Sequence, residues 1–138
     1  MGLGRVLVVD DEANIRKTLR LILTKMGYEV VEAEDGEKGV AAIQKSDKDV
    51  LLVDVVICDL NMPKMNGMEA IAYFRSQFPS VPVIVLTGEP ELQNAEKLKM
   101  EQGVMDYLVK PVQAEQLIAA VQMAALHKAV KGHIFFAT

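Results

Sequence analysis

The chain has 138 residues, 51% of them hydrophobic and 25% charged, which suits one domain with a substantial core and excludes a disordered chain. Its single cysteine, Cys58, excludes an intramolecular disulfide and a multi-cysteine zinc site, and fits the reducing cytoplasm. The formal net charge of −4 and the lack of a basic stripe argue against direct nucleic-acid binding, and no apolar run approaches the roughly 20 residues of a membrane span.

The first part of the chain alternates between strand and helix patterns. Arg5–Val9 is a β-branched apolar run, and apolar residues then recur at helical spacing until Gly27 marks a helix end. Tyr28–Ala33 is typical of a strand. A second helix is predicted to extend to about Ser46, with Asp35 near its start as a capping residue.

The middle of the chain continues this alternation. Two further strands, Val55–Cys58 and Val81–Leu86, flank a helix predicted from Gly67 to Phe78. One face of that helix is predicted to carry its apolar residues Met68, Ile71, Ala72 and Phe78.

The last third of the chain completes the pattern. A helix is predicted over Pro90–Gln102, a strand over Met105–Val109 and a final helix over Gln113–Val130. This leaves residues 131–138 as a short tail on a domain that covers residues 1–130. Five strand–helix units in strict alternation predict an α/β fold with a parallel sheet covered by helices on both faces, because each parallel connection needs a crossover.

Polar side chains occur where the predicted strands end. Asp10 and Asp11 follow the first strand, Asp59 the third, Thr87 the fourth and Lys110 the fifth. In an open parallel α/β sheet, ligands bind outside the carboxyl ends of the strands, so we expect these side chains to share one small site. Each acidic residue alone is better explained by a helix cap or a solvated turn, but the combination favours a site.

The residue types at these positions indicate a phosphoryl acceptor. Three neighbouring carboxylates favour a bound cation, and oxygen ligands without histidine or cysteine select a hard ion, with Mg²⁺ expected. Lys110 supplies a positive charge suited to a phosphate, and Thr87 offers a hydroxyl donor. A carboxylate beside a divalent metal and an ammonium group can act as a nucleophile toward phosphorus.

These residues stand in motifs that closely resemble the receiver domains of two-component response regulators. The matching segments are Asp10-Asp11-Glu12, Asp59–Gly67, Thr87-Gly88 and Tyr107–Pro111, and the likeness covers roughly residues 4–130. The resemblance implies a flavodoxin-like, doubly wound (βα)5 domain whose five-stranded parallel sheet has the order 2-1-3-4-5.

The resemblance also implies a role for each acidic residue. Asp59 would accept the phosphoryl group from a phosphohistidine, on a histidine kinase or a histidine phosphotransfer protein. Asp11, Asp59 and the backbone carbonyl of Asn61 would ligate Mg²⁺, with Asp10 contributing mainly through water. The Asp59 carboxylate would thus carry both the metal and the phosphoryl group.

Further residues would transmit the signal. Lys110 would pair with the acceptor carboxylate and then with its phosphate, and the bond between Lys110 and Pro111 would be cis. Thr87 would move to bind the phosphate, and Tyr107 would turn inward behind it. This rearrangement would change the face formed by residues 91–130, where a downstream effector protein docks.

Four other residues near the motifs have weaker interpretations. Asn61 and Glu89 flank the path by which water would attack the phosphate, which predicts that they set the rate of self-dephosphorylation. Glu12 is interpreted mainly as a first-turn helix residue, with a secondary effect on the metal. Cys58 is interpreted as a buried small hydrophobe.

The chain is therefore expected to be a switch that catalyses only its own phosphorylation and dephosphorylation. Two alternatives stay open. An aspartate-nucleophile phosphatase usually needs a second carboxylate close after the nucleophile, where this chain has Asn61. A phosphorylation-independent interaction module with the same fold is less favoured, because the chain keeps the whole set of site residues.

Overall fold

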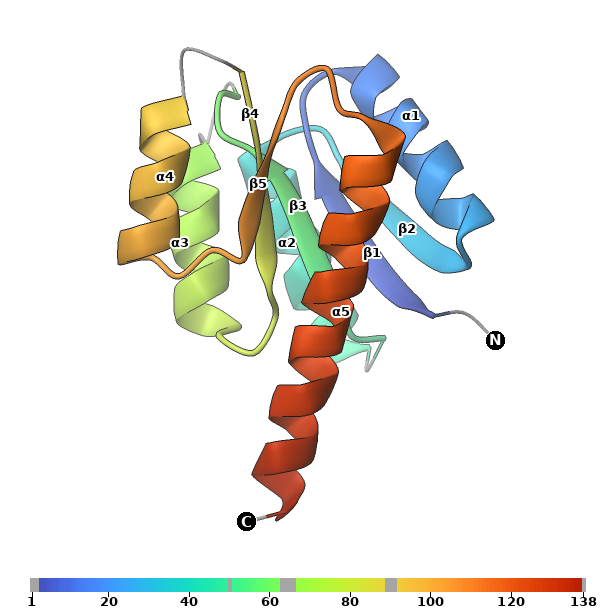
Figure 1. Ribbon diagram of the computed structural model, residues 1–138, viewed down its shortest axis with the longest axis vertical. Coiled ribbons are helices and arrows are strands. Elements are labelled where there is room, and N and C mark those ends of the chain that lie inside the picture. Colours follow the sequence, from blue (N-terminus) through green and yellow to red (C-terminus); the bar gives the residue numbers. More distant parts are fainter. Residues whose placement is uncertain (1–2, 50, 63–66, 89–91, 138) are drawn as a thin grey trace.

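The computed structural model describes residues 3–49, 51–62, 67–88 and 92–137, with the backbone alone for 129–137 (Figure 1). Its strands are β1 (Gly4–Val9), β2 (Tyr28–Ala33), β3 (Val55–Asp59), β4 (Val83–Thr87) and β5 (Asp106–Val109). Its helices are α1 (Ala13–Lys25), α2 (Gly36–Lys48), α3 (Gly67–Gln77), α4 (Leu92–Glu101) and α5 (Ala114–Ala137). The strands pair in parallel in the order β2-β1-β3-β4-β5, which confirms the predicted fold.

The sheet separates two hydrophobic clusters. In β1, Val6 and Val8 pack with residues of α1 and α5, whereas Leu7 and Val9 pack with residues of α2, α3 and α4. Every residue of β3 and β4 is buried, which explains their uninterrupted apolar runs. The edge strand β2 alternates partly between buried and exposed residues, so the expectation of strands buried on both faces holds for the centre of the sheet only.

Two helix boundaries follow from local chemistry that the sequence predicts. The Asp35 carboxylate caps α2, because its Oδ1 accepts a hydrogen bond from the backbone N–H of Lys38 at 2.8 Å. Gly27 follows the end of α1 and has φ of +100°, a conformation that glycine adopts without strain. Gly27 therefore marks the start of β2, and Asp35 marks the start of α2.

The inward face of α3 differs from the prediction. Ile71 is buried as expected, but Met68 and Ala72 are exposed. Ala70 and Phe74 are buried instead, and the fully buried Phe74 ring anchors the helix in the core. The prediction was wrong because it counted apolar residues without placing the large Phe74 ring at the centre of the face.

The final helix is longer than the sequence indicates. α5 extends to Ala137 and so includes most of residues 131–138, which were expected to form a tail. Figure 1 shows this end of α5 projecting beyond the sheet. No helix in the described part of the chain is both long and apolar enough to cross a membrane.

The start of α3 lies directly against the strand end that carries Asp59. A Cβ atom on Gly67 would lie 2.1 Å from the Asp59 carbonyl oxygen and 2.4 Å from the Leu60 Cα. Only glycine therefore fits at this position without a shift of the backbone.

We expect Gly67→Ala to lower the free energy of unfolding by about 3 kcal/mol, because the backbone must move to admit the methyl group. Urea denaturation measures this loss. Met68→Ala, at the exposed neighbouring position, should change stability by less than about 0.5 kcal/mol, and equal stabilities would contradict the prediction.

Candidate functional site

The strand ends bring the predicted charged residues together at one edge of the sheet. Asp10 follows β1 and is fully buried, Asp59 ends β3 and is 4% exposed, and Lys110 follows β5. The Lys110 Nζ lies 2.9 Å from Asp10 Oδ2 and 3.1 Å from Asp59 Oδ2. Parallel pairing of Val9 with Cys58 makes β1 and β3 end at the same level, which explains this convergence. The peptide bond after Lys110 is cis, as the resemblance implied.

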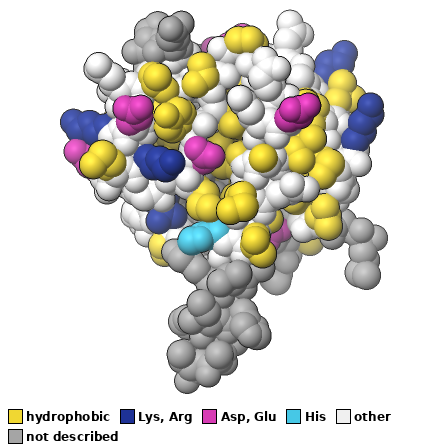
Figure 2. Space-filling view, in the orientation of Figure 1, with side chains coloured by type: hydrophobic (Ala, Val, Ile, Leu, Met, Phe, Trp, Pro, Cys, Tyr) yellow, Lys and Arg dark blue, Asp and Glu magenta, His cyan; other side chains and the backbone are white. Residues whose placement is uncertain are grey.

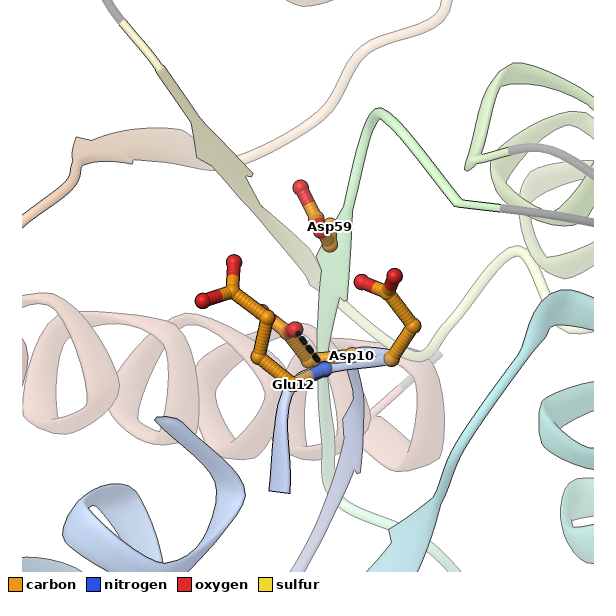
Figure 3. A group of neighbouring side chains, drawn as sticks. Asp10, Glu12 and Asp59 are labelled. Atoms are coloured by element: carbon orange, nitrogen blue, oxygen red, sulfur yellow. Dashed lines mark hydrogen bonds between the residues drawn. The ribbon is translucent and has the colours of Figure 1, made fainter. Parts of the chain in front are cut away.

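Four carboxylates surround a common space at this edge. One oxygen from each of them lies within 4.8 Å of the others, and the residues are Asp10, Asp11, Glu12 and Asp59. Asp10 and Asp59 are buried, whereas Asp11 and Glu12 are exposed. Figure 3 shows Asp10 and Glu12 on one turn after β1, joined by a hydrogen bond of 2.8 Å from the Glu12 N–H to Asp10 Oδ1, with Asp59 opposite.

Burial and like charge together control protonation in the cluster. Burial and the nearby Asp10 carboxylate raise the pKa of Asp59 to about 6, although Lys110 opposes the shift. Burial also raises the pKa of Asp10. Burial disfavours the charged form of Lys110, but the contacts of its ammonium group with the Asp10 and Glu12 carboxylates outweigh burial and raise the pKa of this group. The buried acids Asp10 and Asp59 therefore resist ionisation although Lys110 lies beside them. A second cation would stabilise their charged forms.

The donor atoms of the cluster fit a hard divalent metal. Asp10 Oδ2 is buried and accepts no well-formed hydrogen bond within the described residues, since its approach to Lys110 is a charge contact only. All four acidic side chains offer oxygen atoms, which Mg²⁺ prefers over nitrogen or sulfur. A buried oxygen whose charge contact with Lys110 is shared with two other carboxylates is the kind of group that a metal ion, directly or through its water, would satisfy.

The other residues predicted near the acceptor occupy its rim. Thr87 is buried at the end of β4, and its hydroxyl donates to the Gly88 carbonyl oxygen at 2.9 Å. Asn61 is exposed, and its backbone N–H donates to Asp59 Oδ1 at 3.3 Å. Glu89 lies outside the described residues. Thr87 therefore lies at the end of the strand next to β3, and Asn61 lies two residues after the acceptor.

Tyr107 lies on β5 at the edge of the core and is half-buried. Lys99 of α4 places its Nζ 5.9 Å from the centre of the Tyr107 ring, so the ring is held between two elements. Beside it, β5 and α5 form a groove of about 410 Å³ that includes Val109 and Met123. This side of the molecule faces the viewer in Figure 2, where hydrophobic side chains gather over α5.

Comparison with known proteins decides the family. The family model described as response regulator receiver domain matches residues 6–122. This chain belongs to the response regulator receiver domain family. The transcriptional regulatory protein GlrR of Escherichia coli is 38% identical over 121 residues, which cover 88% of this chain and 26% of GlrR. The chain spans from about a quarter to about half of the length of the curated relatives that it matches.

Solved structures place this receiver domain in the same fold. A response regulator receiver domain protein from Clostridium thermocellum superposes with a TM-score of 0.82 at 35% identity, covering 92% of this chain and 98% of that protein. A CheY-like receiver domain protein from Methanospirillum hungatei gives a TM-score of 0.84 at 26% identity, covering 94% and 99%. The receiver resemblance and its strand order are both confirmed.

One contact of this receiver domain escaped the sequence analysis. The Glu12 carboxylate lies 3.0 Å from the Lys110 Nζ, so Lys110 has three acidic partners. Glu12 precedes α1 as its N-cap position and makes no side-chain capping bond, so its interpretation as a first-turn residue was wrong. Its position directly after two aspartates was the available signal, because a third acid on that turn can reach the same cation.

A second missed residue is Arg16 of α1. Its Nη1 donates to the Asp10 carbonyl oxygen at 2.8 Å and its Nε donates to Glu32 Oε1 at 3.1 Å. Helical periodicity places Arg16 outside the hydrophobic face and predicts a solvated side chain. Only the three-dimensional path of β1 and β2 shows that the guanidinium spans both strands.

Proposed function

We propose that this receiver domain is a phosphorylation-controlled switch in which Asp59 accepts a phosphoryl group from a histidine kinase or a histidine phosphotransfer protein. The observation that carries the proposal is the buried Asp59 carboxylate, 3.1 Å from the Lys110 ammonium and within a group of acidic oxygens. Membership of the receiver family supports it. The chain catalyses only its own phosphorylation and dephosphorylation, and it is not a turnover enzyme.

Three residues of the cluster are suited to hold Mg²⁺. Asp11 and Asp59 would ligate it together with the Asn61 backbone carbonyl, and Asp10 would act mainly through bound water. When bound, Mg²⁺ offsets the negative charge of the carboxylates and of the phosphoryl oxygens, so that two anions approach each other. The exposed position of Asp11 leaves the metal side of the cluster open to solvent and to the phosphoryl donor.

Asp59 is the nucleophile in this proposal. A carboxylate oxygen of Asp59 forms a bond to phosphorus while the bond between phosphorus and the histidine nitrogen breaks. The electron pair of the broken bond returns to the imidazole ring, which takes up a proton from solvent. Lys110 lies within reach of the incoming phosphoryl oxygens and stabilises the charge that spreads over them in the transition state.

The phosphate then changes the groups around it. It adds about −1.5 to −2 charge at a position fixed by Lys110, and the Thr87 hydroxyl turns from the Gly88 carbonyl to a phosphate oxygen. Tyr107 moves inward from its half-buried position, and the surface of residues 91–130 changes for a downstream effector protein. Coupling of about 1–3 kcal/mol between site and surface is enough for such a switch.

Intact-mass spectrometry after incubation with acetyl phosphate and Mg²⁺ tests the proposal. We expect one phosphate on the wild-type chain, none on Asp59→Asn, and none when Mg²⁺ is chelated. An unmodified wild-type chain would refute the proposal, and if it also failed to bind beryllofluoride with Mg²⁺, a phosphorylation-independent interaction module would be favoured. Many turnovers of a chromogenic phosphate ester per chain would instead favour the phosphatase.

The same phosphoprotein allows the dephosphorylation step to be measured. We propose that Asn61, which is exposed beside the acceptor, sets the lifetime of the aspartyl phosphate by its position next to the path of the attacking water. Asn61 is exposed next to Asp59, so a larger side chain there would block the water without disturbing the core.

A further inference from the structure

Arg16 connects the acidic turn after β1 to the neighbouring edge strand. Its guanidinium donates to the Asp10 carbonyl oxygen at 2.8 Å and to the Glu32 carboxylate at 3.1 Å, and its side chain is 16% exposed. A planar guanidinium can bridge two acceptors in fixed directions, which a lysine cannot do. Arg16 therefore fixes the end of β1 relative to β2.

The Asp10 residue that Arg16 contacts is the first residue of the acidic turn. Its backbone N–H donates to the Ala33 carbonyl oxygen at 3.1 Å, and its Oδ1 accepts from the Glu12 N–H at 2.8 Å. With the Arg16 bond, the N–H, the carbonyl and one carboxylate oxygen of Asp10 all have partners. The directions in which Asp11 and Glu12 leave this residue depend on all three bonds.

Arg20 provides a natural comparison on the next turn of α1. It donates to the same Glu32 carboxylate at 2.5 Å and to the Val30 carbonyl oxygen at 3.1 Å. Each arginine thus joins α1 to Glu32 and to one backbone carbonyl. They differ in burial, since the Arg16 side chain is 16% exposed and that of Arg20 is 46% exposed. They also differ in the carbonyl that they hold: that of Arg16 belongs to the acidic turn, and that of Arg20 lies well within β2.

We propose that Arg16 is a positioning residue for the metal and phosphoryl site, which it serves by holding the turn that carries Asp10, Asp11 and Glu12. This inference rests on the proposed function of that site. Arg16 touches neither metal nor phosphate. It acts through the Asp10 carbonyl, so its removal disorders the carboxylates that must converge on one ion.

Mg²⁺ titration of the full chain by isothermal titration calorimetry tests the role of Arg16. We expect Arg16→Met to bind Mg²⁺ about tenfold more weakly than wild type, the loss typical of a group that orients a metal ligand, and Arg20→Met to bind within about twofold. The temperature of thermal unfolding should fall in both variants, because each loses one bond to Glu32 and one to a carbonyl, and it should fall further in Arg16→Met because Arg16 is the more buried. Amide hydrogen exchange at Glu12 should become faster in Arg16→Met only.

Arg16→Lys keeps the positive charge and serves as a second test variant if Arg16→Met does not fold. Because its single ammonium group cannot bridge both acceptors, we expect Mg²⁺ binding at least about threefold weaker than wild type. Wild-type affinity in the folded Arg16 variants, or an equal loss in Arg20→Met, would overturn the positioning role and leave the proposed switch intact. Failure of the wild-type chain to bind Mg²⁺ would overturn both.

Discussion

Asp59→Asn should raise the free energy of unfolding of the metal-free protein at neutral pH, although it removes the phosphoacceptor. The Asp59 side chain is 6% exposed, and its pKa is raised to about 6 because burial and Asp10 disfavour its charged form more than Lys110 favours it. The neutral amide of asparagine avoids this cost. We expect a gain of about 2–3 kcal/mol in a chelating buffer, measured by urea denaturation.

The gain should disappear in acid, because of the direction of the Asp59 pKa shift. The folded-state pKa of about 6 lies above the ordinary value of 3.8, so between these values the folded protein binds a proton that the unfolded chain does not. Protonation of Asp59 therefore contributes to the free energy of unfolding of wild type. This contribution grows as the pH falls through 6, reaches its full value below about pH 4, and is lost again as the pH rises. Asp59→Asn should thus match wild type near pH 4.

Two comparisons make the Asp59→Asn prediction decisive. Saturating Mg²⁺ should stabilise wild type and remove most of the difference, since the ion binds the folded protein only. Asp11→Asn, on the facing turn but exposed, should give a smaller gain in a chelating buffer because its charge stays in contact with water. A metal-free Asp59→Asn protein less stable than wild type at neutral pH would show that the Lys110 contact, and not repulsion and burial, dominates.

The convergence of the site could be predicted because it depends on the backbone alone. Asp10, Asp59 and Lys110 stand at or directly after strand ends, and parallel strands of a doubly wound sheet end at one edge whatever their side chains are. The Asp35 cap and the bounds of Tyr28–Ala33 were likewise set by local chemistry and were confirmed.

Features that depend on long side chains or on tertiary packing could not be read from the sequence. Glu12 and Arg16 reach the site across several rotatable bonds, and nothing in their spacing specifies which carbonyl or ammonium group they meet. The burial of Phe74 in place of Met68 reflects the space between α3 and the sheet. The extension of α5 past residue 130 was missed because Lys131 and Gly132 are typical of a helix end, whereas the helix continues through them.

Lys110→Met should have the opposite effect to Asp59→Asn. Lys110 has an 18% exposed side chain and contacts the carboxylates of Asp10 and Asp59, whose side chains are 0% and 6% exposed. Removing one partner of a buried ion pair leaves uncompensated charge, so we expect the metal-free protein to lose about 3 kcal/mol at neutral pH. Phosphate uptake from acetyl phosphate should slow by about 100-fold or more, because the transition state loses its fixed cation.

The dependence of this loss on Mg²⁺ separates an electrostatic cause from a packing cause. Mg²⁺ places new positive charge among the same carboxylates, so it should restore a large part of the lost stability, whereas a packing defect would persist.

Lys128→Met is the matched control for Lys110→Met. Lys128 pairs with Asp54 at 2.9 Å, but both side chains are more exposed, at 24% and 34%. Its loss should be below about 1 kcal/mol and indifferent to Mg²⁺. Equal, Mg²⁺-insensitive losses in the two variants would mean that Lys110 supports the fold as a spacer, and the charge balance proposed for the acceptor site would have to be abandoned.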